Sequence, residues 1–197
     1  MQPQDRPRDP EVATFLAALE TAVMADAPAG SEARAAATRV FGRTRSRTGS
    51  AGGAASGLPV CAILPGCYAA ARDDTRRPVA EAFAALAPRL RWTVRTSSGD
   101  ARFREGHANA MVVGPDGIEA RDDVRIGVSL MAPHVDYPIH VHPPEEVYFS
   151  LTPGEWWNDR MDWADPGPRG LIYNPPGIRH AMRSGESPFL AIWLLPT

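Results

Sequence analysis

A chain of 197 residues is long enough for one domain with a hydrophobic core and an added segment, but it is short for two full domains. Hydrophobic residues make up 44% of the chain and charged residues 22%, as in ordinary globular proteins, and no apolar run approaches the roughly 20 residues that cross a bilayer. The net charge of −2 gives no general attraction to nucleic acid, and because all 21 basic residues are arginine, lysine Schiff-base and lysine-base chemistry is excluded.

The first ninety residues are predicted to be mostly helical. The dipeptide Asp9–Pro10 is typical of a helix start, and apolar residues recur at helical spacing through EVATFLAALETAVM. A second helix is predicted from Ser31 through EARAAATRVF, and it is followed by a loop at about 44–58 in which all periodicity is lost. A third helical pattern covers Asp74 to Leu90. We therefore predict a helical segment over 1–90 that packs on the remainder of the chain.

The N-terminus and the cysteines bear on the compartment. MQPQDRPRDPEV has no apolar stretch of the kind found in a secretory signal, so a cytoplasmic protein is expected. Cys61 and Cys67 are too far apart for a CxxC redox motif and too few for a zinc knuckle or a disulfide framework. They are interpreted as buried free thiols.

A β domain is predicted over 91–197. Short β-favouring runs are divided there by Gly, Pro, Asp and Asn, which is typical of a sandwich or a barrel. The sequence contains no glycine-rich phosphate loop and no Walker motif, so it gives no support for a nucleotide site. The predicted strands are WTVR, NAMVVG, VRIGVSLM, EEVYFSL, GLIYN, HAMRS and FLAIWLL.

Four side chains of this β region form a candidate metal site. His140 and His142 are two residues apart, so in a strand they share one face, and Glu146 and His180 follow nearby. Three imidazoles and a carboxylate suit zinc, Fe(II), manganese, cobalt or nickel, and this mixed set does not choose between them. Any one of these histidines could be an ordinary surface residue, but the joint spacing favours one divalent transition metal ion.

The same spacing resembles the two motifs of the cupin superfamily, G(X)5HXH(X)3-4E(X)6G and G(X)5PXG(X)2H(X)3N. The resemblance implies a mainly β fold, a cupin (double-stranded β-helix or jelly-roll) barrel with a metal inside it. The departures fall at turn positions and not at ligand positions. The matched residues are His140, His142, Glu146, Pro175, Gly177 and His180; Gly154 and Gly170 are each one residue late, Pro133 or His134 stands at the first glycine, and Ser184 replaces the last asparagine.

A narrower resemblance is to the bacterial cupin-type dimethylsulfoniopropionate (DMSP) lyases. It rests on the tyrosine two residues after the motif glutamate in HVHPPEEVYFSL, on the GEWW that follows, and on the small size with a helical N-terminal part. It covers roughly residues 125–197 by motif. The resemblance implies cleavage of DMSP to dimethyl sulfide and acrylate, with Tyr148 close to the metal and taking part in catalysis. It further implies that His142, Glu146 and His180 are ligands, that His140 is a ligand or an adjacent group, and that Tyr137 lies in the pocket.

The chemistry of this elimination fits these residue types. A proton alpha to a carboxylate is a weak acid, so a divalent metal bound to the carboxylate would stabilise the developing charge. A phenol beside a divalent cation is more easily ionised, so a tyrosine can serve as the base. Tyr148 is the first candidate for this base and Tyr137 the second. A strand tyrosine packed in the core is the structural alternative for Tyr148.

The sulfonium cation of the substrate calls for an electron-rich wall. Not all of the aromatic residues of the β half can line one pocket, and each could instead belong to the core, to the barrel rim or to a dimer contact. His134 could be a proton carrier, a group next to the ligands or a loop residue, and His107 is interpreted as structural. The candidate aromatic residues are Trp156, Trp157, Trp163, Tyr173 and Trp193.

Two other functions remain open because the cupin fold supports many reactions. An Fe(II) dioxygenase would use the same ligands and would consume oxygen. A non-enzymatic metal or ligand sensor would use the helical part to bind a partner, although the sequence contains no helix-turn-helix pattern or basic recognition helix. Cupins often pair through their strands, so a homodimer is an alternative to a monomer.

Overall fold

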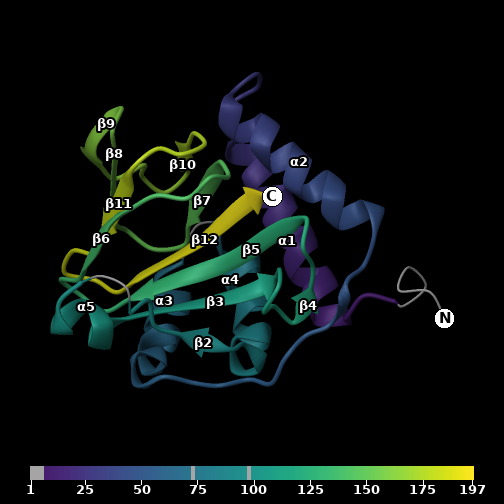
Figure 1. Cartoon of the computed structure of the whole chain (residues 1–197), viewed down its shortest axis with the longest axis horizontal. Helices are drawn as coiled ribbons and strands as arrows, with labels where there is room; N and C mark the ends of the chain where they lie inside the picture. Colours follow the sequence, from purple (N-terminus) through teal and green to yellow (C-terminus); the bar gives the residue numbers. More distant parts are fainter. Residues whose placement is uncertain (1–6, 72–73, 97–98) are drawn as a thin grey trace.

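The computed structural model describes residues 7–71, 74–96 and 99–197. Helices α1 to α4 lie against the larger of two β-sheets, α5 lies apart from them, and the C-terminal strand β12 runs through the middle of the larger sheet (Figure 1). The helices are α1 (Pro10–Asp26), α2 (Glu32–Ser46), α3 (Leu64–Ala70), α4 (Arg77–Leu86) and α5 (Ala101–Gly106), with 3₁₀ turns at Pro59–Ile63 and Ala87–Arg89.

The larger sheet has the strand order β1-β4-β3-β5-β12-β7-β10, with β2 paired to β3, and the smaller sheet has the order β6-β11-β8-β9. All neighbours are antiparallel except β3 and β4. The strands are β1 (Ser50–Ala51), β2 (Trp92–Thr93), β3 (His107–Val113), β4 (Glu119–Ala120), β5 (Val124–Met131), β6 (Asp136–His140), β7 (Glu146–Ser150), β8 (Glu155–Asn158), β9 (Met161–Ala164), β10 (Leu171–Asn174), β11 (His180–Arg183) and β12 (Phe189–Pro196).

Alternation along the strands gives the larger sheet two different faces. In β12, Leu190, Ile192 and Leu194 belong to the hydrophobic core shared with the helices. Phe189 and Ala191 belong to a second core enclosed between the two sheets. Because successive side chains of a strand point to opposite faces, the helices cover one face and the barrel interior lies on the other. The fold is therefore the expected mainly β cupin barrel with N-terminal helices.

The helix starts that the sequence predicts are confirmed. The Asp9 carboxylate accepts hydrogen bonds from the amides of Glu11 and Val12, at 3.0 and 3.3 Å, and so caps α1. The Ser31 hydroxyl accepts from the amide of Arg34 at 3.2 Å and caps α2. The third predicted helix is shorter than expected, because α4 begins at Arg77 and its last turn is 3₁₀.

The loop predicted at about 44–58 begins later than expected, since α2 continues to Ser46. Long-range contacts stabilise the last turn of α2. Arg121 donates to the carbonyl oxygens of Arg43 and Arg47, at 2.9 and 2.6 Å, and Arg43 donates to the carbonyl oxygen of Asp123 at 2.7 Å. Three helical segments between 59 and 106, at Pro59–Ile63, α3 and α5, were not predicted from the sequence.

A buried ion pair joins the helices to the barrel. The Arg76 guanidinium lies 2.6 Å from the Asp26 carboxylate, donates to the carbonyl oxygen of Ser150 at 3.0 Å and covers the ring of Phe149 at 4.6 Å. Both charged side chains are almost fully buried. Among the described residues, no helix combines the length and the apolar character needed to cross a membrane.

Candidate functional site

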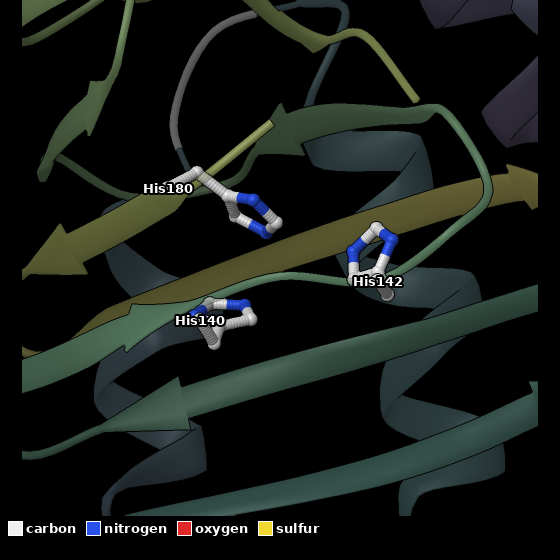
Figure 2. A group of neighbouring side chains, drawn as sticks. All are labelled: His140, His142 and His180. Carbon is white, nitrogen blue, oxygen red and sulfur yellow. The ribbon is translucent and has the colours of Figure 1, made fainter. Parts of the chain in front are cut away.

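The fold brings His140, His142 and His180 together. His140 ends β6, His142 follows it, and His180 begins β11, where it is paired directly with His140. The three rings surround a common space, and their ligand-capable nitrogens lie within 4.8 Å of one another (Figure 2). Ring centroids are 4.1 Å apart for His140 and His180, and 4.9 Å apart for His142 and His180. These three imidazoles could hold a metal ion.

Backbone carbonyl groups orient all three rings. The Nδ1 atoms of His140, His142 and His180 lie 2.9, 2.9 and 3.0 Å from the carbonyl oxygens of Pro138, Pro144 and Ile178. A carbonyl can only accept, so Nδ1 carries the proton in the neutral ring and the Nε2 lone pair is left for a ligand. This arrangement is common around metal-bound histidines.

Glu146 completes the group. Its side chain is 4% exposed, and its Oε2 lies 3.3 Å from His142 Nε2 and 3.2 Å from His180 Nε2. Burial is the largest effect and disfavours the carboxylate, but the two histidines outweigh it and lower the pKa of Glu146 to about 2. Asn174 Nδ2 lies 3.4 Å from the same oxygen, and Asn158 Nδ2 donates to Asn174 Oδ1 at 3.0 Å.

The hydrogen-bonding atoms of the three histidines and Glu146 show whether these residues fit a cation. With the proton on Nδ1, the Nε2 lone pairs of His142 and His180 point at the Glu146 carboxylate, so a positive charge is needed between these groups. A metal ion can supply it, as can a proton on His142, whose pKa is raised because Glu146 outweighs the lowering effect of burial. His180 Nε2 is buried and has no hydrogen-bond partner among the described residues. Burial, and then His180, lower the pKa of His140 to about 3, so this ring is neutral at pH 7. Three imidazoles and a buried carboxylate that converge on one space fit a divalent transition metal.

The two candidate tyrosines lie beside these residues in different surroundings. Tyr148 is 2% exposed, and burial followed by the charge of Glu146 raises its pKa well above 10. Tyr137 packs its ring 4.9 Å from that of His140. Its hydroxyl oxygen accepts a hydrogen bond from Asn109 Nδ2 at 3.0 Å, and burial raises its pKa while Asn109 and Arg95 oppose that rise.

A cavity of about 160 Å³ opens between the two sheets at this group. A larger surface hollow of about 520 Å³ lies near Arg8 and Glu119 and contains none of the candidate ligands, so the smaller cavity is the one relevant to the chemistry. The cavity is lined by His140, His142, Glu146, Tyr137, Tyr148, Trp193, Leu195, Met111, Asn109, Ser129, Arg95 and Arg125.

The arginines, Asn109 and Ser129 of this lining were not predicted from the sequence. Period-two alternation in β3 and β5 could have placed Asn109 with Met111, and Arg125 with Ser129, on common faces. It could not have shown which strands pair or that these faces point toward the histidines.

Of the candidate substrate-binding residues, Trp193 alone lines the cavity. It is paired with Tyr148 across β12 and β7. Gly127 lies opposite Trp193 on β5, and a Cβ there would meet the indole ring at 2.2 Å, so the glycine leaves room for that ring. Trp156 is in the core between the sheets, with its ring 6.0 Å from Tyr148 and 5.0 Å from Phe189.

The remaining candidates lie outside the lining of this cavity. Trp157 directly follows Trp156 in β8, and adjacent residues of a strand point to opposite faces, so only one of them faces inward. Tyr173 packs with the helical core and donates to Glu145 Oε2 at 2.9 Å. His134 is a half-exposed turn residue at φ 59°, with its ring 3.3 Å from Glu186. Trp163 is on the surface beneath Arg183, at 4.4 Å.

Comparison with known proteins identifies similar sequences. The model of the DMSP lyase (dimethylsulfoniopropionate lyase) family matches residues 32–191. Dimethylsulfoniopropionate lyase DddQ of Ruegeria pomeroyi is 32% identical over 130 residues, which are 64% of this chain and 61% of that protein. The putative dimethylsulfoniopropionate lyase DddL of Cereibacter sphaeroides is 32% identical over 109 residues, 55% of this chain and 46% of that protein. The matches thus span about half to three fifths of these relatives.

Solved structures share the fold over nearly the whole chain. The crystal structure of DMSP lyase DddQ from Ruegeria pomeroyi has a TM-score of 0.73 and 23% sequence identity, and the alignment covers 96% of this chain and 93% of that one. A second crystal structure, in work on the DMSP lyases RdDddP and RnDddQII, has a TM-score of 0.72 at 19% identity and covers 95% and 92%. The helices and the barrel therefore recur together in these proteins.

Proposed function

The chain belongs to the DMSP lyase family, and from that premise we propose that it cleaves DMSP to dimethyl sulfide and acrylate by β-elimination. The observation that carries the proposal is that one cavity is lined by His140, His142, Glu146, two buried tyrosines and Trp193, with His180 beside the other two histidines. These groups supply the functions the reaction needs, which are charge stabilisation, a base and a wall for a cation.

We expect His140, His142, His180 and Glu146 to hold one divalent transition metal ion, through the three Nε2 atoms and the carboxylate. Zn, Fe(II), Mn, Co and Ni all suit this set of nitrogen and oxygen ligands. Bound there, such an ion would act as a Lewis acid toward the substrate carboxylate and would favour the phenolate form of a nearby tyrosine.

Tyr148 is the proposed general base. As a phenolate, its oxygen takes the proton from the carbon alpha to the carboxylate, the C–H electron pair forms the double bond of acrylate, and the C–S pair leaves on neutral dimethyl sulfide. Because burial and Glu146 raise the pKa of Tyr148 well above 10, the protein alone keeps this hydroxyl protonated. The assignment therefore requires activity to depend on bound metal.

Tyr137 is the second candidate for the base. Asn109 donates a hydrogen bond to its hydroxyl oxygen, and Arg95 also interacts with it; both interactions stabilise a phenolate. Burial still raises the pKa of Tyr137, but Asn109 and Arg95 donate to its hydroxyl oxygen and oppose that rise, whereas Tyr148 has Glu146 beside it as a partner that raises its pKa further.

Trp193 is the proposed wall for the sulfonium group. Its indole borders the cavity beside Tyr148, and an electron-rich ring face attracts a cation by roughly 0.5–2 kcal/mol. A sulfonium placed against it would leave the carboxylate end toward the histidines.

The proposal is tested by measuring headspace dimethyl sulfide released from DMSP by purified protein, as prepared, after chelation and after adding back each of the five metals. Release that chelation abolishes and one metal restores is the expected result. An Fe(II) oxygenase would use the same ligands, so oxygen uptake is measured in the same samples. No release from protein that binds a stoichiometric metal would refute the lyase assignment and favour an oxygenase or a sensor.

A homodimer and a cytoplasmic location stay predictions, which light scattering and cell fractionation would check.

A further inference from the structure

The cavity lining includes a group of polar side chains outside the candidate ligand set. Asn109 on β3 is paired with Ser129 on β5, and the Ser129 hydroxyl donates to Asn109 Oδ1 at 2.8 Å. That contact turns the amide nitrogen of Asn109 toward the hydroxyl oxygen of Tyr137, at 3.0 Å. Since this oxygen already accepts a hydrogen bond, the tyrosine proton is available to a further acceptor.

Arg95 reaches the same group from the residues after β2. It lines the cavity, and its guanidinium interacts with the Tyr137 hydroxyl. Its positive charge also reaches His140, His142 and Tyr148. Arg125 lies at a different place in the lining, where β5 pairs with Leu195 of β12, and its side chain is exposed.

His107 fixes the backbone that carries Arg95. The Arg95 amide donates to His107 Nε2 at 3.0 Å, while His107 Nδ1 contacts the carbonyl oxygen of Phe103. The His107 ring is 1% exposed and stacks on the ring of Phe103, with centroids 3.6 Å apart and planes 7° apart. Both ring nitrogens therefore bind backbone groups, and the imidazole holds Arg95 in place.

The charges of the lining define what the cavity can bind. Glu146 is the one carboxylate among the described lining residues, and it already lies against His142 and His180. An anion entering the cavity would meet the guanidinium of Arg95 and the hydroxyl of Tyr137, and a guanidinium binds a carboxylate well because its planar N–H groups match the two oxygens. A sulfonium would be repelled from Arg95 toward Trp193.

We propose that Arg95 binds the carboxylate of the substrate together with the metal ion of the proposed function and makes the cavity selective for carboxylates over uncharged compounds of the same shape, with His107 as its positioning residue. The proposal deepens the proposed lyase function, because it names the group that fixes the orientation of a substrate carrying a cation at one end and a carboxylate at the other.

The test measures binding without turnover. Propionate and its uncharged isostere propionamide are titrated into metal-loaded protein and followed by NMR chemical shifts. Arg95→Met is expected to weaken propionate binding about 10- to 100-fold, as for loss of a hydrogen-bonded charge partner, and to change propionamide binding less than about twofold. Arg95→Lys, which keeps the charge without the planar donors, is expected to bind propionate with an affinity between those of wild type and Arg95→Met. Arg102→Met, an exposed arginine on α5, is the matched control and should match wild type.

Two further variants separate this assignment from its rivals. If Arg125→Met weakens propionate binding as much as Arg95→Met does, the arginines act by general electrostatic attraction, and the proposed specific contact of Arg95 is refuted. If Arg95→Met has no effect in a Tyr137→Phe background, Arg95 acts only through the tyrosine, and the assignment is likewise overturned. Carboxylate selectivity that depends on Arg95 in a protein that releases no dimethyl sulfide would support this inference while refuting the lyase function.

The role of His107 is tested through the same selectivity. His107→Leu removes the acceptor for the Arg95 amide, and it is expected to reduce the ratio of propionamide to propionate dissociation constants at least about fivefold. His107→Gln, which keeps an acceptor near the Nε2 position, is expected to restore most of the ratio. Selectivity that stays at the wild-type level in a folded His107→Leu protein would show that the imidazole does not position Arg95.

Discussion

Glu146 has the most demanding electrostatic environment of the candidate site. Its carboxylate is buried and is kept ionised by His142 and His180, so replacing it by glutamine leaves the size almost unchanged but removes the only carboxylate among the described lining residues. We predict that Glu146→Gln lowers metal affinity about 100-fold or more, measured by competition with a chelator. Glu145→Gln is the matched control, because Glu145 binds Arg39 and Tyr173 outside the cavity and should leave the affinity unchanged. Equal affinities in the two variants would remove Glu146 from the ligand set.

The two tyrosines lead to different expectations when each loses its hydroxyl. We predict that Tyr148→Phe keeps most of the bound metal and lowers kcat by about 10²- to 10⁴-fold, since a general base is worth that much. Metal content and turnover are measured on the same preparation. Tyr173→Phe is the control, because that hydroxyl binds Glu145 on the helix side of the sheet. Turnover retained in Tyr148→Phe and lost in Tyr137→Phe would assign the base to Tyr137.

At the scale of elements, the end of α2 is held by the turn between β4 and β5. Arg121 has a fully buried side chain and donates to the Asp123 carboxylate at 2.9 and 2.7 Å while also binding the carbonyl oxygens of Arg43 and Arg47. The Arg121 hydrogen bonds lower the pKa of Asp123 to about 2, against the effect of burial and with help from Arg47. These contacts explain why α2 continues past the end of its apolar pattern.

The Arg121–Asp123 ion pair is expected to make the unfolding free energy depend on pH. Since the pKa of Asp123 is lower in the folded chain than in the unfolded one, its contribution is complete above about pH 4 and is lost as pH falls toward 2. We predict that Asp123→Asn lowers the unfolding free energy by about 1–2 kcal/mol at pH 7, and that the difference from wild type shrinks between about pH 4 and pH 2 in urea denaturation. Asp122→Asn, an exposed neighbour, should have little effect at either pH. A difference that does not vary with pH would mean that Asp123 contributes by packing alone.

At the scale of the whole molecule, the candidate metal site joins the two sheets. Glu146 belongs to the larger sheet through β7, whereas His140 and His180 belong to the smaller sheet through β6 and β11. A metal ion bound by residues of both sheets would oppose their separation on unfolding. The site is therefore placed to couple metal binding to global stability.

We predict that metal raises the melting temperature by about 5–10 °C when its concentration is about 100-fold above the dissociation constant, as binding to the folded state alone requires. Differential scanning calorimetry of chelated and metal-loaded protein measures this shift. The Glu145→Gln protein should show the same rise and the Glu146→Gln protein should lose most of it. A rise of equal size in both variants would indicate that the stabilising ion binds elsewhere.

The sequence alone determined the features that depend on neighbouring residues. Helix starts at Asp9 and Ser31 were predictable because a capping side chain binds amides two or three residues away. The spacing of two residues predicted that His140 and His142 lie close together, although β6 ends at His140 and His142 lies in the segment after it. Joining them to His180 depended on a motif whose spacing is typical of the cupin barrel. The ligand assignment itself stays a prediction until a metal is measured.

Only the tertiary structure decided what depends on register and on which sheet face a strand presents. Arg95, Asn109 and Tyr137 come from three strands or their extensions, and nothing local in the sequence shows that they meet. The same is true of the tryptophans, because Trp193 lines the cavity while Trp156 is enclosed in the core. The physical reason is that period-two alternation tells which residues share a face, but pairing between distant strands determines which faces enclose the cavity.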